Sequence, residues 1–163
     1  MDWTASDVMQ TDVRTVGAEM VLAELDRAFL EDRVSGFPVV QDERLVGLVC
    51  RSDVVRQLGV EQSVAETISD YYRDVGGVGT EPAKTLDSIA RQVGARIEKL
   101  RVKDVMTHEL ITVSPADSLQ EVARSLVEHG IHRLPVVDAG RLVGILTSLD
   151  LVRLFAEGRA KPI

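Results

Sequence analysis

Two short groups of residues in the second half of the chain have types and spacings suited to binding a phosphorylated sugar. The first, Thr147-Ser148-Leu149-Asp150, follows an apolar run and therefore lies where a strand gives way to a helix. The first backbone N–H groups of a helix can bind a phosphate, and a carboxylate can accept hydrogen bonds from two ribose hydroxyls. The alternative is structural, with Thr147 as the helix cap and Asp150 interacting favourably with the helix dipole.

The second group is His132-Arg133, which precedes a short apolar run. Arginine offers a planar, bidentate donor to a phosphate, and histidine is a donor whose charge changes near neutral pH. The alternative is a solvated polar pair at the start of a strand. The pattern therefore favours a phosphate contact without requiring one.

Catalysis finds little support in the residue pattern. His108, His129 and His132 lack the spacing of a metal site, and no nucleophile is grouped with a base. The sequence contains neither a Walker loop nor a Gly-x-Gly-x-x-Gly run. The single cysteine, Cys50, cannot form an internal disulfide, which fits a reducing compartment. We therefore expect no enzymatic activity, no catalytic cofactor and no metal site.

The elements that must position these groups are clearest between residues 117 and 155. Ser118 and Glu121 have the spacing of a capping box, and Gly130 has the place of a residue that ends a helix. The helix between them carries an apolar stripe, namely Leu119, Val122, Ala123, Leu126 and Val127. Residues 134–137 and 142–146 then read as strands, and residues 148–155 read as a second helix.

The chain contains an internal repeat at a constant offset of 97 residues, as from Asp7 to Asp104. The segments that recur without a gap include Asp-Val-Met, Thr-Val, Pro-Val-Val and Arg-Leu-Val-Gly. The first copy predicts a helix over 20–33, strands over 37–40 and 45–50, and a helix over 52–58. Each copy thus reads as extended segment, helix, strand, strand, helix. This indicates an α/β (α+β) fold of two repeats packed about a pseudo-twofold axis.

The predicted organisation has four parts: repeat 1 over 6–58, a helical insert or linker over 59–101, repeat 2 over 102–156, and a tail over 157–163. Within the insert we expect a short helix over 61–72, a glycine-rich loop over 74–80 and a helix over 82–100. The last helix either packs on its own repeats or contributes to a dimer contact.

These motifs resemble the CBS domain, a family named after cystathionine beta-synthase, in which two tandem domains form a Bateman module. The resemblance rests on Val-Lys-Asp-Val-Met-Thr at 102–107, Thr-Val-Ser-Pro at 112–115, His-Arg-Leu-Pro-Val-Val at 132–137 and Gly-Ile-Leu-Thr-Ser-Leu-Asp-Leu at 144–151. It implies a stand-alone regulatory pair that binds AMP, ADP, ATP or S-adenosylmethionine in the cleft between the repeats, with or without Mg²⁺.

The resemblance also assigns roles to individual residues. Thr147, Ser148 and Asp150 correspond to the motif for ribose and phosphate, and His132-Arg133 with Pro135 is similar to the phosphate-binding sequence in the gamma subunit of AMP-activated protein kinase. Ile111, Thr112 and Val113 correspond to the segment beside the adenine, which needs flat apolar surface. The first copy has Cys50 in place of the hydroxyl and Ser35-Gly36 in place of His-Arg. A weaker second cleft would use Thr15, Phe37, Pro38, Arg51 and Asp53.

Composition narrows the choice of partners. The 163 residues carry 19 basic and 26 acidic side chains, for a net charge of −7, which disfavours single-stranded nucleic-acid binding. No apolar run is long enough for a membrane span, and no signal peptide is visible, so we expect a cytoplasmic protein. We expect a homodimer through apolar residues left uncovered on the helices, namely Leu25, Phe29, Val55, Val152 and Phe155, and an unidentified regulated protein. The alternative function is a structural or oligomerisation module with no bound nucleotide.

Overall fold

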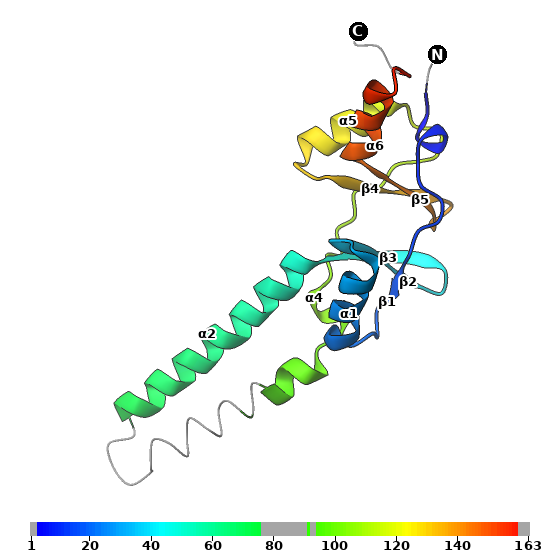
Figure 1. Ribbon diagram of the computed structural model, residues 1–163. Helices are drawn as coiled ribbons and strands as arrows, with labels where there is room; N and C mark the ends of the chain where they lie inside the picture. Colours follow the sequence, from blue (N-terminus) through cyan, green and yellow to red (C-terminus); the bar gives the residue numbers. More distant parts are fainter. Residues whose placement is uncertain (1–2, 76–90, 92–93, 160–163) are drawn as a thin grey trace. The chain divides into compact units, whose positions relative to one another are not determined.

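The computed structural model describes residues 3–75, 91 and 94–159 (Figure 1). The helices and strands follow the predicted order twice, which confirms the α+β fold class. The first set is η1 (Ala5–Asp7), β1 (Val16–Gly17), α1 (Leu22–Asp32), β2 (Gly36–Gln41), β3 (Arg44–Cys50) and α2 (Arg51–Val75). The second set is α4 (Val102–Val105), α5 (Leu119–Glu128), β4 (Arg133–Asp138), β5 (Arg141–Thr147) and α6 (Ser148–Ala156).

The chain divides into two compact units that differ from the two sequence repeats. The unit that contains Asp150, called the Asp150 unit, consists of Met1–Thr15, Val40–Val46 and Glu109–Ile163. The Asp53 unit consists of Val16–Val39 and Gly47–His108. Each unit is described separately below.

The difference arises because the leading segments of the two repeats are exchanged. In the Asp150 unit, Gln10 pairs with Ile145 of β5 in an antiparallel bridge. In the Asp53 unit, Thr107 pairs with Leu48 of β3 in the same way. Both members of the second pair stand 97 residues from their counterparts in the first, so the exchange is reciprocal. The sequence assigned each leading segment to its own repeat, whereas the structure packs it against the strands of the other repeat.

A glycine in each unit makes this packing close. A Cβ atom at Gly144 would lie 2.5 Å from the Met9 sulfur, and one at Gly47 would lie 2.5 Å from the Met106 sulfur. The leading segment can therefore cross the strand only where the side chain is a hydrogen atom. The repeated Asp-Val-Met and Val-Gly motifs of the sequence are thus the two sides of one contact.

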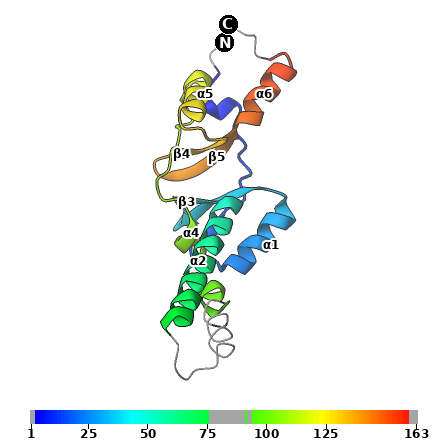
Figure 2. The same ribbon diagram turned by 90° about the vertical axis from the view of Figure 1, so that its left-hand side faces the viewer.

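In the Asp150 unit, β4 and β5 form an antiparallel hairpin in which Leu134 faces Leu146. Helices α5 and α6 lie on one face of this hairpin (Figures 1 and 2). The core between them is built from Ala5, Val113, Val122, Leu126, Leu134, Val136 and Leu146. Burial of these side chains is the main stabilising contribution, at roughly 1.5–3 kcal/mol for each large one.

In the Asp53 unit, the rings of Phe29 on α1 and Phe37 on β2 stack with centroids 5.2 Å apart. Leu25 and Phe29 are almost completely buried, at 0% and 1% exposed. The prediction that these two residues remain partly uncovered is therefore wrong, because both project from α1 onto the strands. Val55 on α2 remains exposed, as predicted.

Helix α5 begins and ends as the sequence predicts. The Ser118 hydroxyl accepts a hydrogen bond from the Glu121 N–H at 3.3 Å, and the Glu121 carboxylate accepts one from the Ser118 N–H at 2.9 Å. Gly130 follows the helix with a φ of 61°. Val127, however, is exposed, because the core-facing side of the helix is set by Leu119, Val122 and Leu126.

Helix α2 runs without interruption from Arg51 to Val75, so the expected break after residue 58 is absent. Gly59 lies inside this helix, where a glycine costs about 1 kcal/mol. Hydrogen bonds between side chains one turn apart help to offset that cost, such as the bond from Gln62 to Glu66 at 3.0 Å. Asp74 and Val75 are helical instead of belonging to a loop. The remaining loop over 76–80 and most of the helix expected over 82–100 lie outside the described residues, although 94–99 are helical.

Residues 94–99 are held against α2 by an ion pair. The Arg96 Nε lies 3.3 Å from a carboxylate oxygen of Glu61, whose side chain is buried. Pairing is what makes a buried carboxylate tolerable. Among the described helices, none is both long and apolar enough to cross a membrane.

Candidate functional site

The start of α6 in the Asp150 unit holds the most closely arranged polar residues of the predicted site. The Oδ2 atom of Asp150 accepts hydrogen bonds from the Thr147 N–H at 2.8 Å and from the Thr147 hydroxyl at 2.6 Å. The Thr147 Oγ1 in turn accepts a bond from the Asp150 N–H at 3.3 Å. This capping box fixes the rotamer of Asp150, whose side chain is buried. The structural interpretation of the motif is therefore confirmed, and the ligand-binding interpretation must use the other oxygen.

That other oxygen, Oδ1 of Asp150, accepts a hydrogen bond from the Gln10 side-chain amide at 2.9 Å. Gln10 was absent from the residues predicted from sequence. Gln10 directly follows the repeated Asp-Val-Met motif, but only the exchange of the leading segments brings its side chain to Asp150. The sequence carried no direct sign of this contact, because the two residues are 140 positions apart.

The N-terminus of α6 is less free to bind an anion than the sequence suggested. The Ser148 N–H donates to the His132 carbonyl at 3.0 Å, and the Asp150 N–H donates to Thr147. Two of the first three backbone donors therefore already have partners. The Ser148–His132 bond also ties the start of the helix to the start of β4, which brings the two predicted groups together.

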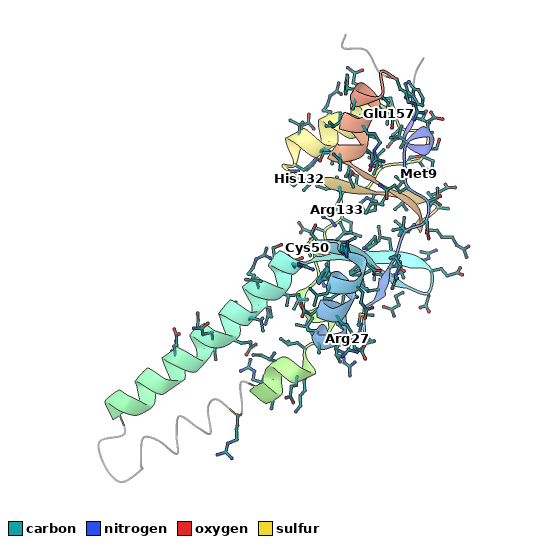
Figure 3. All side chains as sticks on the ribbon, in the orientation of Figure 1. Met9, Arg27, Cys50, His132, Arg133 and Glu157 are labelled. Atoms are coloured by element: carbon teal, nitrogen blue, oxygen red, sulfur yellow. The ribbon has the colours of Figure 1, made fainter. Side chains whose placement is uncertain are left out.

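His132 and Arg133 lie at the start of β4 (Figure 3). The His132 side chain is exposed and that of Arg133 is half-buried. The bond from the Ser148 N–H places the His132 backbone beside the first turn of α6. A phosphate contact by the His132 and Arg133 side chains stays a prediction.

The segment expected beside an adenine runs parallel to β4. Val113 donates its N–H to the Pro135 carbonyl at 3.1 Å and accepts from the Val137 N–H at 2.8 Å. The Val113 side chain belongs to the hydrophobic core, and Ile111 packs against that core while half-buried. Thr112 is exposed between them. Ile111 and Thr112 thus remain candidates for a base contact. Val113 and Pro135 instead join the segment to β4 through their backbone hydrogen bond.

The residues predicted to form a second site are arranged differently. The Oδ2 atom of Asp53 accepts from the Cys50 N–H at 2.7 Å, and its Oδ1 lies 3.4 Å from an Arg56 nitrogen. The Arg51 guanidinium donates to the Phe29 carbonyl at 3.0 Å and covers the Phe29 ring. Arg51 is thus directed toward the end of α1 in this structure.

The other members of the second set are less well placed for a ligand. Phe37 and Pro38 are buried in the Asp53 unit. Thr15 belongs to the Asp150 unit, so the structure does not assemble the five residues within one unit. The difference between the two sites is therefore larger than the substitution of one hydroxyl by a thiol.

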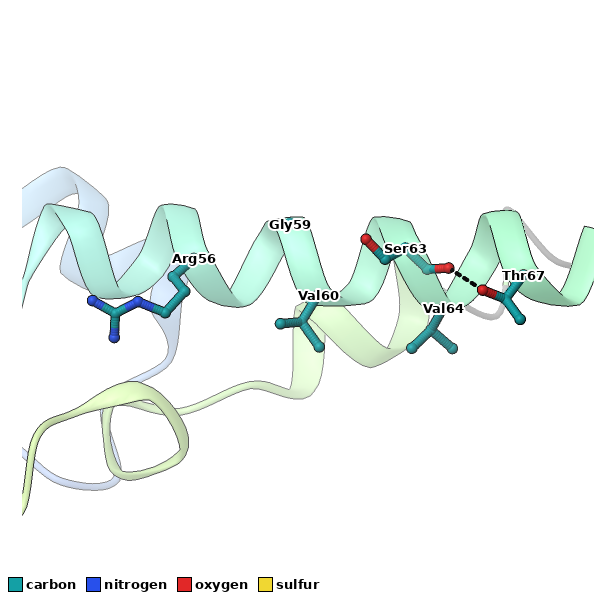
Figure 4. A pocket seen from close by; sticks show the side chains of 6 residues that line it. All are labelled: Arg56, Gly59, Val60, Ser63, Val64 and Thr67. Carbon is teal, nitrogen blue, oxygen red and sulfur yellow. Dashed lines mark hydrogen bonds between the residues drawn. The ribbon is translucent and has the colours of Figure 1, made fainter.

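A separate cavity of about 580 Å³ runs along α2 (Figure 4). It is lined by Arg56, Gly59, Val60, Ser63, Val64 and Thr67, and it contains none of the predicted site residues. The Thr67 hydroxyl donates to the Ser63 carbonyl at 2.9 Å, so that polar side chain is already satisfied. Within the described part of the chain, no group of three or more His, Cys, Asp or Glu side chains could hold a metal ion.

A duplicated α+β unit with a capped aspartate after its last strand defines a class of paired domains. The chain belongs to the CBS domain family, whose model matches residues 5–60 and 102–157. It is 31% identical over 152 residues to an uncharacterized protein of Methanocaldococcus jannaschii, MJ1225, covering 93% of this chain but only 42% of that relative. It is 30% identical over 148 residues to MJ1426 of the same organism, covering 90% of this chain and 87% of that relative.

A solved structure of CBSX2 in complex with AMP has the same fold, with a TM-score of 0.69 at 26% identity. The match covers 97% of this chain and 99% of that structure. CBSX2 is known as a chloroplastic CBS domain-containing protein of Arabidopsis thaliana.

Proposed function

We propose that this protein is a non-enzymatic regulatory module that binds an adenosyl ligand at the site around Asp150. The observation that carries the proposal is the buried Asp150 carboxylate, which Thr147 holds through one oxygen. Its other oxygen accepts one hydrogen bond, from Gln10, and can accept another from a ligand. A fixed carboxylate of this kind suits a ribose diol, because both hydroxyls are donors. The AMP complex of CBSX2 supports the choice of ligand class.

In this proposal each group of the Asp150 unit has one role. Asp150 accepts from the ribose, while His132 and Arg133 contact the phosphate from the start of β4. Ile111 and Thr112 lie beside the adenine. The ligand acts on a partner protein only by the difference between its affinities for two states of the module. The second site, around Asp53, is weaker because Arg56 already pairs with the carboxylate.

Titration calorimetry with AMP, ADP, ATP and S-adenosylmethionine tests the proposal, with each nucleotide measured both in Mg²⁺ and in EDTA. Native mass spectrometry of freshly purified protein reports any ligand carried through purification. We expect at least one adenosyl compound to bind with a one-to-one stoichiometry. Absence of binding by all four compounds at millimolar concentration would instead favour a purely structural module. That second function is favoured by one observation, the satisfaction of Asp150 by Thr147 and Gln10 within the chain.

We also propose that the protein assembles as a homodimer. Val55 and Leu58 on α2 are exposed, and so are Val152 and Phe155 on α6, each 97 residues further along. We call the pair on α2 and the pair on α6 the two helix patches, one in each unit. Because the two helices carry equivalent apolar positions, a second copy can cover each patch with an equivalent one. Light scattering at tens of micromolar should give twice the mass of the chain.

The dimer has a matched pair of variants. Phe155→Asp adds a charge to the helix patch on α6 and should give a monomer. Gln120→Asp adds the same charge at an exposed polar position of α5 and should leave the dimer intact. A monomeric wild-type protein would overturn this part of the proposal.

A further inference from the structure

The hydrogen bond between Gln10 and Asp150 joins the leading segment of the chain to the proposed ribose acceptor. The Gln10 backbone is fixed on both sides, since its N–H donates to the Ile145 carbonyl and its carbonyl accepts from the Ile145 N–H, each at 2.9 Å. The side-chain amide then reaches Asp150 Oδ1 at 2.9 Å. A residue held in this way has a defined position relative to α6, even though its own surface is exposed.

The chemistry of the carboxylate fixes the orientation of the amide. An ionised carboxylate only accepts hydrogen bonds, so the Gln10 Nε2 must face Asp150. The Gln10 Oε1 is then left as an acceptor directly beside the carboxylate. Oδ2 of Asp150 already accepts two hydrogen bonds from Thr147, and one acceptor position of Oδ1 is taken by Gln10. Counting two acceptor positions for each oxygen, Asp150 therefore has one position left, on Oδ1.

A ribose presents two neighbouring hydroxyl donors, and one remaining position on Oδ1 satisfies only one of them. We infer that Gln10 is a specificity-determining residue of the Asp150 site. Asp150 Oδ1 accepts a hydrogen bond from one ribose hydroxyl, and Gln10 Oε1 accepts a hydrogen bond from the other. The inference rests on the proposed function. It gives the site a reason to discriminate ribose from deoxyribose, because each hydroxyl has its own acceptor.

The site around Asp53 supplies the contrast. The position equivalent to Gln10 is Thr107, whose backbone pairs with Leu48 as Gln10 pairs with Ile145. Its shorter side chain carries no amide, and Asp53 Oδ1 pairs instead with Arg56. The amide acceptor therefore belongs to the Asp150 site alone, which makes Thr107→Ala a matched control.

The test is a calorimetric cycle in the full chain with AMP, 2′-deoxy-AMP and 3′-deoxy-AMP. Gln10→Ala should weaken AMP binding about tenfold, the effect of losing one hydrogen bond in a charged network. One of the two deoxy analogues should bind the wild type and Gln10→Ala with equal affinity, because it lacks the hydroxyl that donates a hydrogen bond to Gln10. Gln10→Met keeps the length of the side chain without its polar atoms and should behave like Gln10→Ala. Thr107→Ala should bind all three nucleotides as the wild type does.

The outcomes separate this inference from the function on which it rests. If the wild type binds AMP and Gln10→Met binds it equally well, the inference is wrong while the proposed function stands. The same conclusion follows if Gln10→Ala weakens both deoxy analogues as much as AMP. If the wild type binds no adenosyl compound, the proposed function fails and the inference falls with it. Thermal unfolding of each variant, in the absence of nucleotide, shows whether a loss of affinity comes from a loss of folded protein.

Discussion

Asp150 and Asp53 lie 97 residues apart and accept the same backbone hydrogen bond, but their second oxygens have different partners. Oδ2 accepts from the Thr147 N–H at 2.8 Å in one case and from the Cys50 N–H at 2.7 Å in the other. Oδ1 meets an amide, Gln10, in the first site and a guanidinium, Arg56, in the second. A guanidinium competes with a ligand for the carboxylate more strongly than a neutral amide does.

This difference predicts that the two aspartates contribute unequally to nucleotide binding. In Asp150→Asn, the remaining oxygen must keep accepting from Thr147, so the new amide group takes the place of Oδ1 and that position no longer accepts a hydrogen bond from a ribose. We expect a loss of roughly ten- to hundredfold in AMP affinity. Asp53→Asn should cost less. Calorimetric titration of both variants decides, and a larger loss for Asp53→Asn would reverse the ranking of the sites.

A second prediction concerns the phosphate. If His132 and Arg133 contact it, His132→Ala and Arg133→Ala should each weaken AMP about tenfold and leave adenosine affinity unchanged, because adenosine lacks the charged group. His129→Ala is the matched control, since that exposed imidazole is bonded within its own helix, to the Ser125 carbonyl at 2.9 Å. Equal losses for AMP and adenosine would show that the two residues act on the fold of the site.

A third prediction concerns helix ends. Arg33 ends α1 with a φ of 54°, and Gly130, its counterpart in the other repeat, follows α5 with a φ of 61°. Left-handed backbone is costly for a residue with a Cβ atom and natural for glycine. Arg33→Gly should therefore stabilise the protein by about 0.5–1 kcal/mol.

Gly130→Ala should destabilise the protein by a similar amount, and it isolates the backbone effect because a Cβ there would meet no atom within 4 Å. Urea unfolding of the two variants measures both changes. Opposite signs are expected, and a destabilised Arg33→Gly would show that the Arg33 side chain contributes more than its backbone costs.

A fourth prediction concerns pH. The hydrogen bond from the Ser118 hydroxyl, followed by that from the Ser118 N–H, holds the pKa of Glu121 below its ordinary value of 4.5. A carboxyl whose pKa is lowered by folding stabilises the protein above the unfolded pKa and loses that contribution as pH falls through the folded pKa. The stability difference between the wild type and Glu121→Gln should therefore shrink below about pH 4.5.

Urea unfolding between pH 7 and pH 3 measures this difference. Glu128→Gln, near the other end of α5, removes one negative charge without removing a capping box. Its difference from the wild type provides the baseline for general charge effects. A Glu121→Gln difference that stays constant over the whole range would contradict the prediction.

The sequence predicts local structure well because local structure here depends on local patterns. The Ser118–Glu121 spacing, the apolar strand over 142–146 and the helix start at Ser148 each follow from a few neighbouring residues, and the structure confirms them. The same holds for the cap formed by Thr147 and Asp150. The side chain of the third residue of a helix lies close to the backbone N–H of the capping residue, so this contact depends on local geometry alone.

What the sequence could not supply depends on contacts between distant segments. Gln10 reaches Asp150 only because the leading segments are exchanged between the repeats. The sequence of an internal repeat is the same with and without such an exchange, so it does not reveal the contact. The continuity of α2 through Gly59 was missed for a related reason. Glu61 is paired with Arg96, 35 residues away, and this contact favours the helix beyond what its own composition suggests.

A fifth prediction follows from the close packing of the exchanged segment. A Cβ atom at Gly144 would lie 2.9 Å from Met9 Cγ and 3.1 Å from the Gln10 carbonyl oxygen. The Met9 side chain can turn aside, but the carbonyl is fixed by its hydrogen bond from the Ile145 N–H. Gly144→Ala should therefore push the leading segment away from β5 and destabilise the protein by about 1–3 kcal/mol.

Gly47→Ala is the matched variant, because a Cβ there would meet Met106 and the Thr107 carbonyl oxygen at 3.2 Å. The two substitutions should lower the free energy of unfolding by similar amounts, since the contacts are equivalent. They should differ in ligand binding, because only Gly144→Ala displaces Gln10 from Asp150. Urea unfolding and AMP titration of both variants separate the effects. Equal AMP affinities at equal stability would mean that the position of the leading segment does not control the site around Asp150.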